Sequence, residues 1–456
     1  MRTRGQAAWL VLIGIAALLI RLAPLARHDL MFQTGWDAAD YIPLAEGIEH
    51  GCGFARLVNG HCGSPNASRP PGYPYFVALM PNLRTVLVIQ AILGATLCVW
   101  LGWFVSGRWG IRAGLLAETL LTIDIPTIVY GAMIMSEATF QFLLTGAILL
   151  QLSAIIAAEW TWRATARGIA AAVMLAAAAM IRPTGILLPL FAPIPFLISF
   201  RRTNWLRASI FMVLAFVIAI STILAWIARN RAVAGVSAMD TDSAGILYYY
   251  DAAGVLSYAT HRNFFEVEAD LRRRSEETHV LSTGGILRDS LEIFVQHPIA
   301  TAVVIGRGLI YVAMVPARNE LNELIGPKNG GPLKVPPSSD VLVRVRQVLH
   351  SPTLTALVLV QLLLIGFIWL GVARALLRND WMSKRQTALL LIPLAIALIM
   401  LGCAAGPDAH SRFRVPAIPF LAMLAGIGWL GLSKDREVLA QGGFVSRIAS
   451  DRSIAY

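Results

Sequence analysis

The sequence predicts an all-α integral membrane protein that crosses the bilayer about ten times. Hydrophobic residues make up 57% of the 456 residues and charged residues only 14%, whereas soluble domains carry about 25% charged residues. The mean hydropathy is +0.65. Apolar runs recur along the whole chain, and most are 18 residues or longer, which is enough to span ~30 Å of hydrocarbon, although the fifth and sixth are shorter. These observations exclude an ordinary soluble protein.

The apolar runs define the expected spans and the polar stretches between them. Two long polar stretches, 27–82 and 229–352, interrupt the pattern, and with no repeat or Ser/Gly linker the chain is interpreted as one domain, 1–456. The ten expected spans are 7–26, 83–105, 112–131, 137–157, 167–182, 184–200, 208–228, 353–377, 387–405 and 415–433.

Basic residues predict the orientation, because short cytoplasmic loops collect Lys and Arg. This rule places both termini in the cytoplasm and both long stretches outside. It also explains the net charge of +11 without a nucleic-acid partner, although some of the excess can meet membrane lipids. A cleaved signal peptide ending near 23–26 is the alternative interpretation of the N-terminus. The basic connections contain Arg2, Arg4, Arg108, Arg112, Arg163, Arg167, Arg201, Arg202, Arg207, Arg374, Arg378, Lys384 and Arg385.

The second long stretch contains two segments of its own. Residues 299–315 are apolar enough to span, but a crossing there would place the basic loop 374–385 outside, so we expect an interfacial or re-entrant helix. Residues 262–279 are heavily charged and predict a solvated helix over the membrane.

The four cysteines form no metal motif. Cys98 and Cys403 lie in apolar runs, which is typical of buried thiols. Cys52 and Cys62 share the first polar stretch and can form a disulfide if that stretch faces an oxidising compartment; two free thiols are the alternative.

Three acidic residues at the outer ends of helices are candidates for catalysis. A charged group beside hydrocarbon costs free energy, so one that is present there is a candidate for a functional role. Asp37, Asp40 and Tyr41 are spaced to share one helix face, where a carboxylate could accept a proton and the tyrosine could contact a substrate. Glu137 follows Ser136 at the start of a span. The simpler explanation is structural, because Asp37 and Ser136 are also good helix N-caps and Glu137 suits a helix dipole.

Several cationic residues on the same side are candidates for binding a phosphate. Arg69 precedes a proline-rich turn with Tyr73, and Arg182 stands in an Arg-Pro-Thr-Gly turn. A guanidinium in a rigid turn suits a phosphate, but a structural ion pair to Asp37, Asp40 or Glu137 explains it equally well. The same alternatives apply to the candidates between the last two spans, which are His410, Arg412 and Arg414.

Signals for other ligands are poor. The sequence contains no P-loop, no HExxH and no GxGxxG motif after a strand, so no metal ligand is assigned, although a divalent cation remains open. Because the candidates gather outside, where nucleotide sugars are absent, a sugar donor would be lipid-linked.

Taken together in chain order, these motifs resemble the GT-C superfamily of polyprenyl-phosphate-sugar glycosyltransferases. The resemblance is to bacterial members of glycosyltransferase family 39, which are related to protein O-mannosyltransferases and the lipid A aminoarabinose transferase. That family often has Asp-Glu where this chain has Asp37-Ala38. The landmarks are Asp37-x-x-x-Tyr41, Gly51-Cys52-Gly53-Phe54, the RPPGYPYF stretch, Ser136-Glu137, Arg182-Pro183, Arg229-Asn230, His297-Pro298 and Ser411-Arg412-Phe413-Arg414-Val415-Pro416.

The resemblance implies a GT-C-like bundle with periplasmic interfacial helices in a bacterial inner membrane. It also implies an inverting transfer of a sugar from a polyprenyl phosphate to a glycan, lipid or protein acceptor on the periplasmic face. Asp37 would be the base, and the arginines would stabilise the leaving phosphate. The alternatives are a polysaccharide polymerase or ligase, which needs no acid in the first loop, and a flippase for a lipid-linked glycan.

Overall fold

The computed structural model describes residues 4–26, 37–157, 161–198, 205–277, 283–317, 352–378 and 384–431. Parts of both expected outer stretches, residues 27–36 and 318–351, lie outside the described residues. In chain order the elements are α1 (Arg4–Leu22), η1 (Ala23–Ala26), α3 (Ala38–Glu49), β1 (Ala55–Val58), β2 (His61–Pro65), α4 (Gly72–Ala78), α5 (Leu83–Trp109), α6 (Ile111–Thr122), α7 (Ile125–Gly131), α8 (Glu137–Ile156), α9 (Trp162–Ile181), η2 (Pro183–Phe191), α10 (Ile194–Ile198), α11 (Trp205–Ala234), α12 (Asp242–Ile246), η4 (Leu247–Ala252), α13 (Ala253–Thr260), α14 (Phe264–Glu277), α15 (Thr283–Gln296), α16 (Pro298–Met314), α19 (Pro352–Leu377), α20 (Lys384–Gly402), η5 (Ser411–Arg414) and α21 (Ile418–Leu430).

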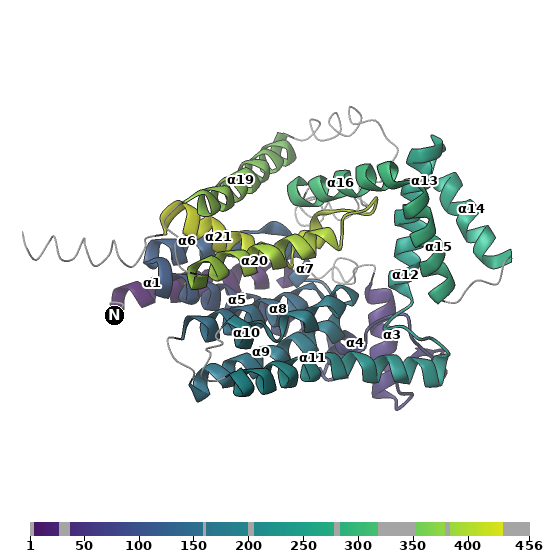
Figure 1. Ribbon diagram of the computed structural model, residues 1–456, viewed down its shortest axis with the longest axis horizontal. Coiled ribbons are helices and arrows are strands. Elements are labelled where there is room, and N and C mark those ends of the chain that lie inside the picture. The colour runs from purple at the N-terminus through teal and green to yellow at the C-terminus, as the bar shows by residue number, and fades with distance from the viewer. Residues whose placement is uncertain are drawn as a thin grey trace, which may run out of the picture.

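The long helices lie side by side in one bundle, and the shorter helices α3 and α12 to α15 gather at one end of it (Figure 1). Among the described residues, six helices are long and apolar enough to cross a membrane, or up to eight if each bent pair is one span. The prediction of an all-α polytopic membrane fold is therefore confirmed. The expected number of ten crossings is not.

The expected span 112–131 is broken into α6 and α7, whose axes differ by 54°. Asp124 causes the break, because its side chain accepts a hydrogen bond from the Thr127 amide at 3.0 Å and so begins a new helix. Pro126 stands in the first turn of α7, where a missing amide hydrogen costs nothing.

The expected span 184–200 is not a regular α-helix either. It forms the 3-10 helix η2 followed by the short helix α10. The reason is composition, because prolines at 183, 189, 193 and 195 remove backbone donors and clash with the preceding turns.

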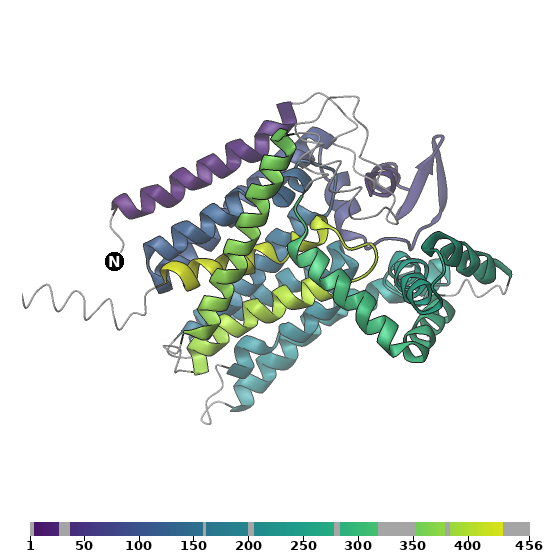
Figure 2. The same ribbon diagram turned by 90° about the horizontal axis from the view of Figure 1, so that it is seen from above.

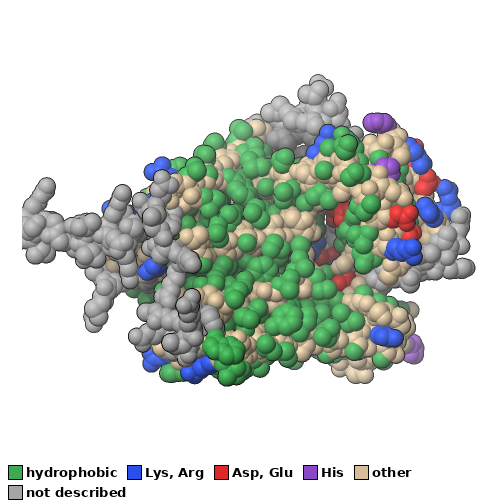
Figure 3. All heavy atoms as spheres, viewed as in Figure 1, with side chains coloured by type: hydrophobic (Ala, Val, Ile, Leu, Met, Phe, Trp, Pro, Cys, Tyr) green, Lys and Arg blue, Asp and Glu red, His purple; other side chains and the backbone are tan. Residues whose placement is uncertain are grey.

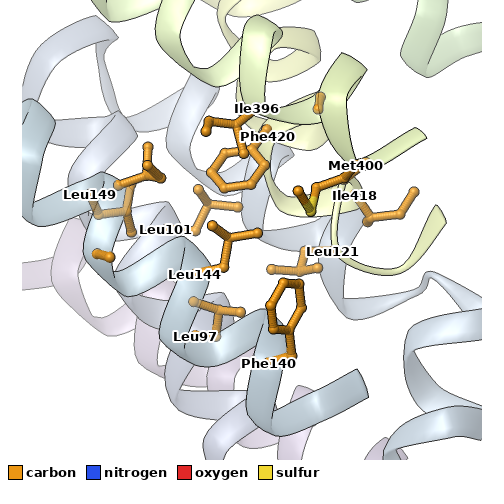
Figure 4. Close-up of a cluster of buried hydrophobic side chains, with 14 of the residues drawn as sticks. Leu97, Leu101, Leu121, Phe140, Leu144, Leu149, Ile396, Met400, Ile418 and Phe420 are labelled. Atoms are coloured by element: carbon orange, nitrogen blue, oxygen red, sulfur yellow. The ribbon is translucent and has the colours of Figure 1, made fainter. Parts of the chain in front are cut away.

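Large apolar side chains from α5, α6, α8, α20 and α21 meet in the middle of the bundle (Figure 4). Phe140 and Phe420 are fully buried there. Elsewhere α19 and α21 approach so closely that Gly428 lies directly on the backbone of Gly371. Small residues allow this approach, which replaces the hydrophobic effect as a source of association in a membrane.

A hairpin and a disulfide shape the first outer loop. β1 and β2 pair in antiparallel fashion, and a disulfide joins Cys52 to Cys62 with a Cα–Cα distance of 5.4 Å. The hairpin projects from the end of the bundle that carries the short helices (Figure 2). The disulfide expected as one alternative is therefore present. Of the two remaining thiols, Cys98 is buried as expected, whereas Cys403 is exposed.

The charged segment 262–279 forms the helix α14 over its described residues, with the ion pairs Arg272–Glu268 and Arg273–Asp270 along its exposed face. Residues 278 and 279 lie outside the described residues. This is the solvated helix that its composition predicts.

The apolar segment 299–315 forms α16, which follows α15 at a bend of 104°. Arg414 donates hydrogen bonds to the carbonyls of Val312 and Val315 in the last turn of α16, at 3.2 and 2.9 Å. The end of α16 therefore lies against η5. By length and composition the bent pair is either a broken span or a re-entrant segment, and the expected interfacial or re-entrant helix stays a prediction.

The surface separates into an apolar belt around the long helices and charged groups towards the ends (Figure 3). A hollow opens where the belt meets the end that carries the short helices, and acidic side chains lie in its wall (Figure 3). A lipid-facing belt with a polar hollow at one end is the arrangement expected for a site reached from the membrane surface.

The close packing of α21 on α19 can be tested with two glycines, one inside the contact and one outside it. Gly428→Ala would push a methyl group into the Gly371 carbonyl, so we expect a loss of about 1–3 kcal/mol in the free energy of unfolding. The control is Gly366→Ala on α19, where an added Cβ meets nothing within 4 Å. Thermal unfolding in detergent measures both, and equal melting temperatures of the two variants would contradict the packing.

Candidate active site

Asp37 stands immediately before α3, but its side chain does not cap that helix. Its two carboxylate oxygens instead accept hydrogen bonds from two arginines that are distant in sequence. Arg69 donates to Oδ1 at 3.2 Å, and Arg412 donates to Oδ2. The capping explanation for Asp37 is therefore wrong, and the acid that sequence analysis singled out lies between two guanidinium groups.

Glu137 and Ser136 at the start of α8 behave in the same way. Ser136 makes no side-chain cap and instead accepts a hydrogen bond from Arg182 at 3.2 Å. Oε1 of Glu137 accepts hydrogen bonds from both Arg182 and Arg412. Its other oxygen, Oε2, is buried without a hydrogen-bond partner among the described residues. A fully buried carboxylate oxygen with unused acceptor capacity is available to a substrate hydroxyl or a water molecule.

Arg69 has three carboxylate partners. It donates to Asp40 at 2.9 and 3.1 Å, to Asp37, and pairs with Asp242 at 3.0 Å. Asp40 is also paired with Arg56. The cluster therefore alternates acids and arginines: Arg56, Asp40, Arg69, Asp37, Arg412, Glu137 and Arg182.

Two tyrosines form a layer beneath this cluster. Tyr41 and Tyr73 meet edge to face with ring centroids 4.7 Å apart, and both are buried. The Tyr73 hydroxyl donates to Gln90 at 2.7 Å, and Gln90 in turn donates to the carbonyls of Gly131 and Met133 just before Ser136. Burial raises the pKa of Tyr41, so its hydroxyl keeps its proton and donates to Ser136. Both tyrosines therefore pack against the cluster, and their expected contacts with a substrate stay a prediction.

His410 and Arg414 flank Arg412 in the sequence, and their expected role in binding a phosphate stays a prediction. Burial, together with the charge of Arg412, lowers the pKa of His410 to about 4, so the ring is neutral at neutral pH. Arg414 is buried and donates hydrogen bonds to the end of α16. Arg412 lies against the acids, where the favourable charges of Glu137 and Asp37 outweigh its burial and raise its pKa.

Sequence analysis missed several members of the cluster. Arg56 carries no motif, and Asp242 lies in the second long polar stretch, far from Arg69 in sequence. Ser136 and Gln90 were not considered as part of a polar network. The available signals were that Gln90 is a polar residue inside an apolar run and that Ser136 stands at the start of one; Arg56 and Asp242 lie in the polar stretches and carried no signal.

A second pair of acids, Asp251 and Asp408, lies beside the cluster, and neither makes an ion pair that the described contacts show. The carboxylate of Asp251 in η4 packs against the backbone of Gly406, near Asp408. Burial and the charge of Asp408 raise the pKa of Asp251 to about 7. No group of three or more metal-ligating side chains occurs within the part of the chain that the structure describes.

Solved structures of other proteins share this fold at low sequence identity. No protein-family profile and no curated protein matches the sequence. The structure is similar to the Archaeoglobus fulgidus oligosaccharyltransferase in its apo form, with a TM-score of 0.45 and 14% identity over 92% of this chain and 50% of that one. It is similar to ArnT from Cupriavidus metallidurans bound to undecaprenyl phosphate, with a TM-score of 0.40 and 14% identity over 93% of this chain and 78% of that one.

A third similar structure is the archaeal oligosaccharyltransferase AglB in complex with an inhibitory peptide and a dolichol-phosphate, at a TM-score of 0.46 and 13% identity. The chain spans about half the length of the archaeal enzyme. These proteins are GT-C-fold glycosyltransferases, the superfamily that the sequence motifs resemble. Similarity at this level transfers no activity from one protein to another, so the function has to be argued from the cluster itself.

The variant Glu137→Gln tests whether the Glu137 carboxylate is the shared counter-ion of Arg182 and Arg412. Because Arg182 and Arg412 would lose their shared buried counter-ion, we expect the free energy of unfolding to fall by about 3–5 kcal/mol. Chemical unfolding in detergent measures this. The control is Glu268→Gln on α14, whose more exposed ion pair with Arg272 should contribute less than about 1 kcal/mol; similar losses in both variants would disprove the assignment.

The variant Asp251→Asn tests the raised pKa of Asp251 through the pH dependence of stability. The folded protein keeps the proton of Asp251 up to a pKa of about 7, whereas an unfolded aspartate loses it near its ordinary value of 3.8. Wild-type stability should therefore fall between about pH 4 and pH 7, and the asparagine lacks this loss. When the pH is raised from 5 to 8, we expect the free energy of unfolding of the wild type to fall by roughly 1–3 kcal/mol more than that of Asp251→Asn. Melting temperatures at both pH values check it, with Asp270→Asn as control; a pH-independent difference contradicts it.

Proposed function

We propose that the chain is a glycosyltransferase that moves a sugar from a polyprenyl-phosphate donor to a hydroxyl or amine of a glycan, lipid or protein acceptor. The observation that carries the proposal is the alternating cluster around Asp37, in which acids and arginines from five separate parts of the chain meet at one end of a membrane bundle. Such a cluster holds both of the groups that this reaction needs. One is a base for the acceptor, and the other is a set of fixed cations for the leaving phosphate.

The donor class follows from the position of the arginines. Arg69, Arg182 and Arg412 present guanidinium groups, which suit phosphate oxygens, at the boundary between the apolar belt and the charged end. A phosphate anchored by a long hydrocarbon chain would reach this boundary by diffusing in the membrane. A soluble anion would not need the apolar belt beside the site.

Asp37 is the proposed base. Its carboxylate would take the proton of the acceptor hydroxyl or amine as the oxygen or nitrogen forms a bond to the anomeric carbon. The bond from that carbon to the phosphate oxygen breaks at the same time, and the polyprenyl phosphate leaves with the electron pair. Because attack and departure occur on opposite faces, the anomeric configuration inverts. Arg412 holds Asp37 on one oxygen, so it can orient the base while the phosphate takes over other guanidinium hydrogen bonds.

Asp40 and Glu137 have supporting roles in this proposal. Asp40 orients Arg69 and Arg56, and Glu137 holds Arg182 and Arg412 in place. Glu137 Oε2, which is buried without a partner among the described residues, is the acceptor for a sugar hydroxyl.

The outer face is the proposed location of the site. The positive-inside rule places the first long loop outside, and that loop contributes Asp37, Asp40 and Arg69. The disulfide between Cys52 and Cys62 in the same loop agrees with an oxidising compartment.

Asp37→Asn tests the proposed base. We expect transfer from synthetic undecaprenyl-phosphate sugars, offered as a panel of hexoses, pentoses and amino sugars, to fall by about 10²–10⁴-fold in kcat. Binding of undecaprenyl phosphate should persist, since the arginines remain. Asp40→Asn is the matched comparison and should mainly raise KM. Full retention of transfer by Asp37→Asn would remove the mechanism and favour a polymerase, ligase or flippase.

A further inference from the structure

Asp242 is the one carboxylate of the Arg69 group that the proposed mechanism does not use. It begins α12, which belongs to the second long outer stretch, and its Oδ2 lies 3.0 Å from Nη2 of Arg69. The neighbouring Thr241 amide donates to the carbonyl of Ala67 at 3.0 Å. The second outer stretch therefore touches the first outer loop directly beside Arg69.

Arg69 carries one positive charge and faces three carboxylates, and these are held unequally. Asp37 and Asp40 each accept hydrogen bonds from Arg69 and also pair with a second arginine. Asp242 has only the ion pair with Arg69 among the described contacts, and its side chain is 34% exposed, against 16% for Asp37 and 24% for Asp40. An incoming anion would therefore displace Asp242 at the lowest cost.

The surroundings of Asp242 do not favour its charged form. Burial raises its pKa, Arg69 opposes this, and the neighbouring acids Asp40, Asp240 and Asp37 raise it further. Three like charges near one carboxylate weaken its hold on the shared arginine. A phosphate carried by a lipid would meet the same acids, but it can engage the remaining arginines of the cluster as well.

We propose that Asp242 occupies the position on Arg69 that the donor's phosphate takes, so that donor binding releases Asp242 and the start of α12. This inference rests on the proposed function, and it names the contact that must open before the donor binds. In the donor-free protein, Asp242 serves as an internal anion that neutralises Arg69.

The release has a defined route into the outer layer. α12, η4 and α13 follow one another without a break from residue 242 to residue 260. Elsewhere the same segment contacts the rest of the protein at Pro407 and Gly406, through Gly254 and Asp251, and at Arg307 of α16, which lies over the Tyr258 ring. Displacing Asp242 frees the attachment at the start of α12, so the segment 242–260 should become more accessible to solvent when the phosphate is bound.

Asp242→Asn in the full-length protein, reconstituted in nanodiscs, provides the test. Because a competing charge is removed while the arginine stays, we expect undecaprenyl phosphate to bind roughly fivefold or more tightly, as measured by native mass spectrometry. Asp270→Asn on α14, whose partners are Arg262 and Arg273, is the control and should bind as the wild type does. In an Arg69→Gln background the Asp242→Asn change should have no effect, because the two residues act on one contact.

Hydrogen–deuterium exchange of the wild type offers a second readout that needs no variant. Exchange in 242–260 should rise when undecaprenyl phosphate is added. Unchanged or weaker binding by Asp242→Asn, or unchanged exchange in that segment, overturns the inference while wild-type binding keeps the proposed function intact. Absence of binding to the wild type, in contrast, overturns the proposed function and the inference with it.

Discussion

The hydrogen bonds that Arg412 donates to both Asp37 and Glu137 are the interaction on which the cluster depends. They connect the first outer loop, the start of α8 and the segment before α21, which are far apart in sequence. Both partners are poorly solvated, so the charges are costly unless they are paired. Each acid in this site therefore needs an arginine partner, and this requirement holds three parts of the bundle at one point.

The bundle around this point is built to support it. Small residues allow α19 and α21 to touch along their backbones, and broken elements such as α6–α7 and η2 supply ends where a polar side chain can leave the hydrocarbon. Arg182 stands between α9 and η2, and Glu137 begins α8, so each charged group occupies a helix terminus. Tyr41 and Tyr73 pack edge to face beside the cluster, where Tyr41 donates a hydrogen bond to Ser136 and Tyr73 donates one to Gln90.

The arrangement also explains why the simpler structural explanation fails at two positions. Asp37 and Ser136 are good N-caps in general, yet here both side chains bond to arginines, because a charge-assisted hydrogen bond in a poorly solvated site outweighs a single capping hydrogen bond. The same surroundings act on His410, whose pKa is lowered by burial and by the neighbouring Arg412. Arg414 follows Arg412 by two residues and donates to the end of α16, a contact that no local pattern reveals.

The sequence by itself determined the membrane class, most of the helical segments and the acids and arginines worth inspecting. These follow from properties that are local along the chain, namely the length of apolar runs and the cost of keeping charges beside hydrocarbon. Only the tertiary structure decided which of these charges meet. Arg412 reaches Asp37, and Asp242 reaches Arg69 from the second long outer stretch, because such pairings depend on how distant helices pack.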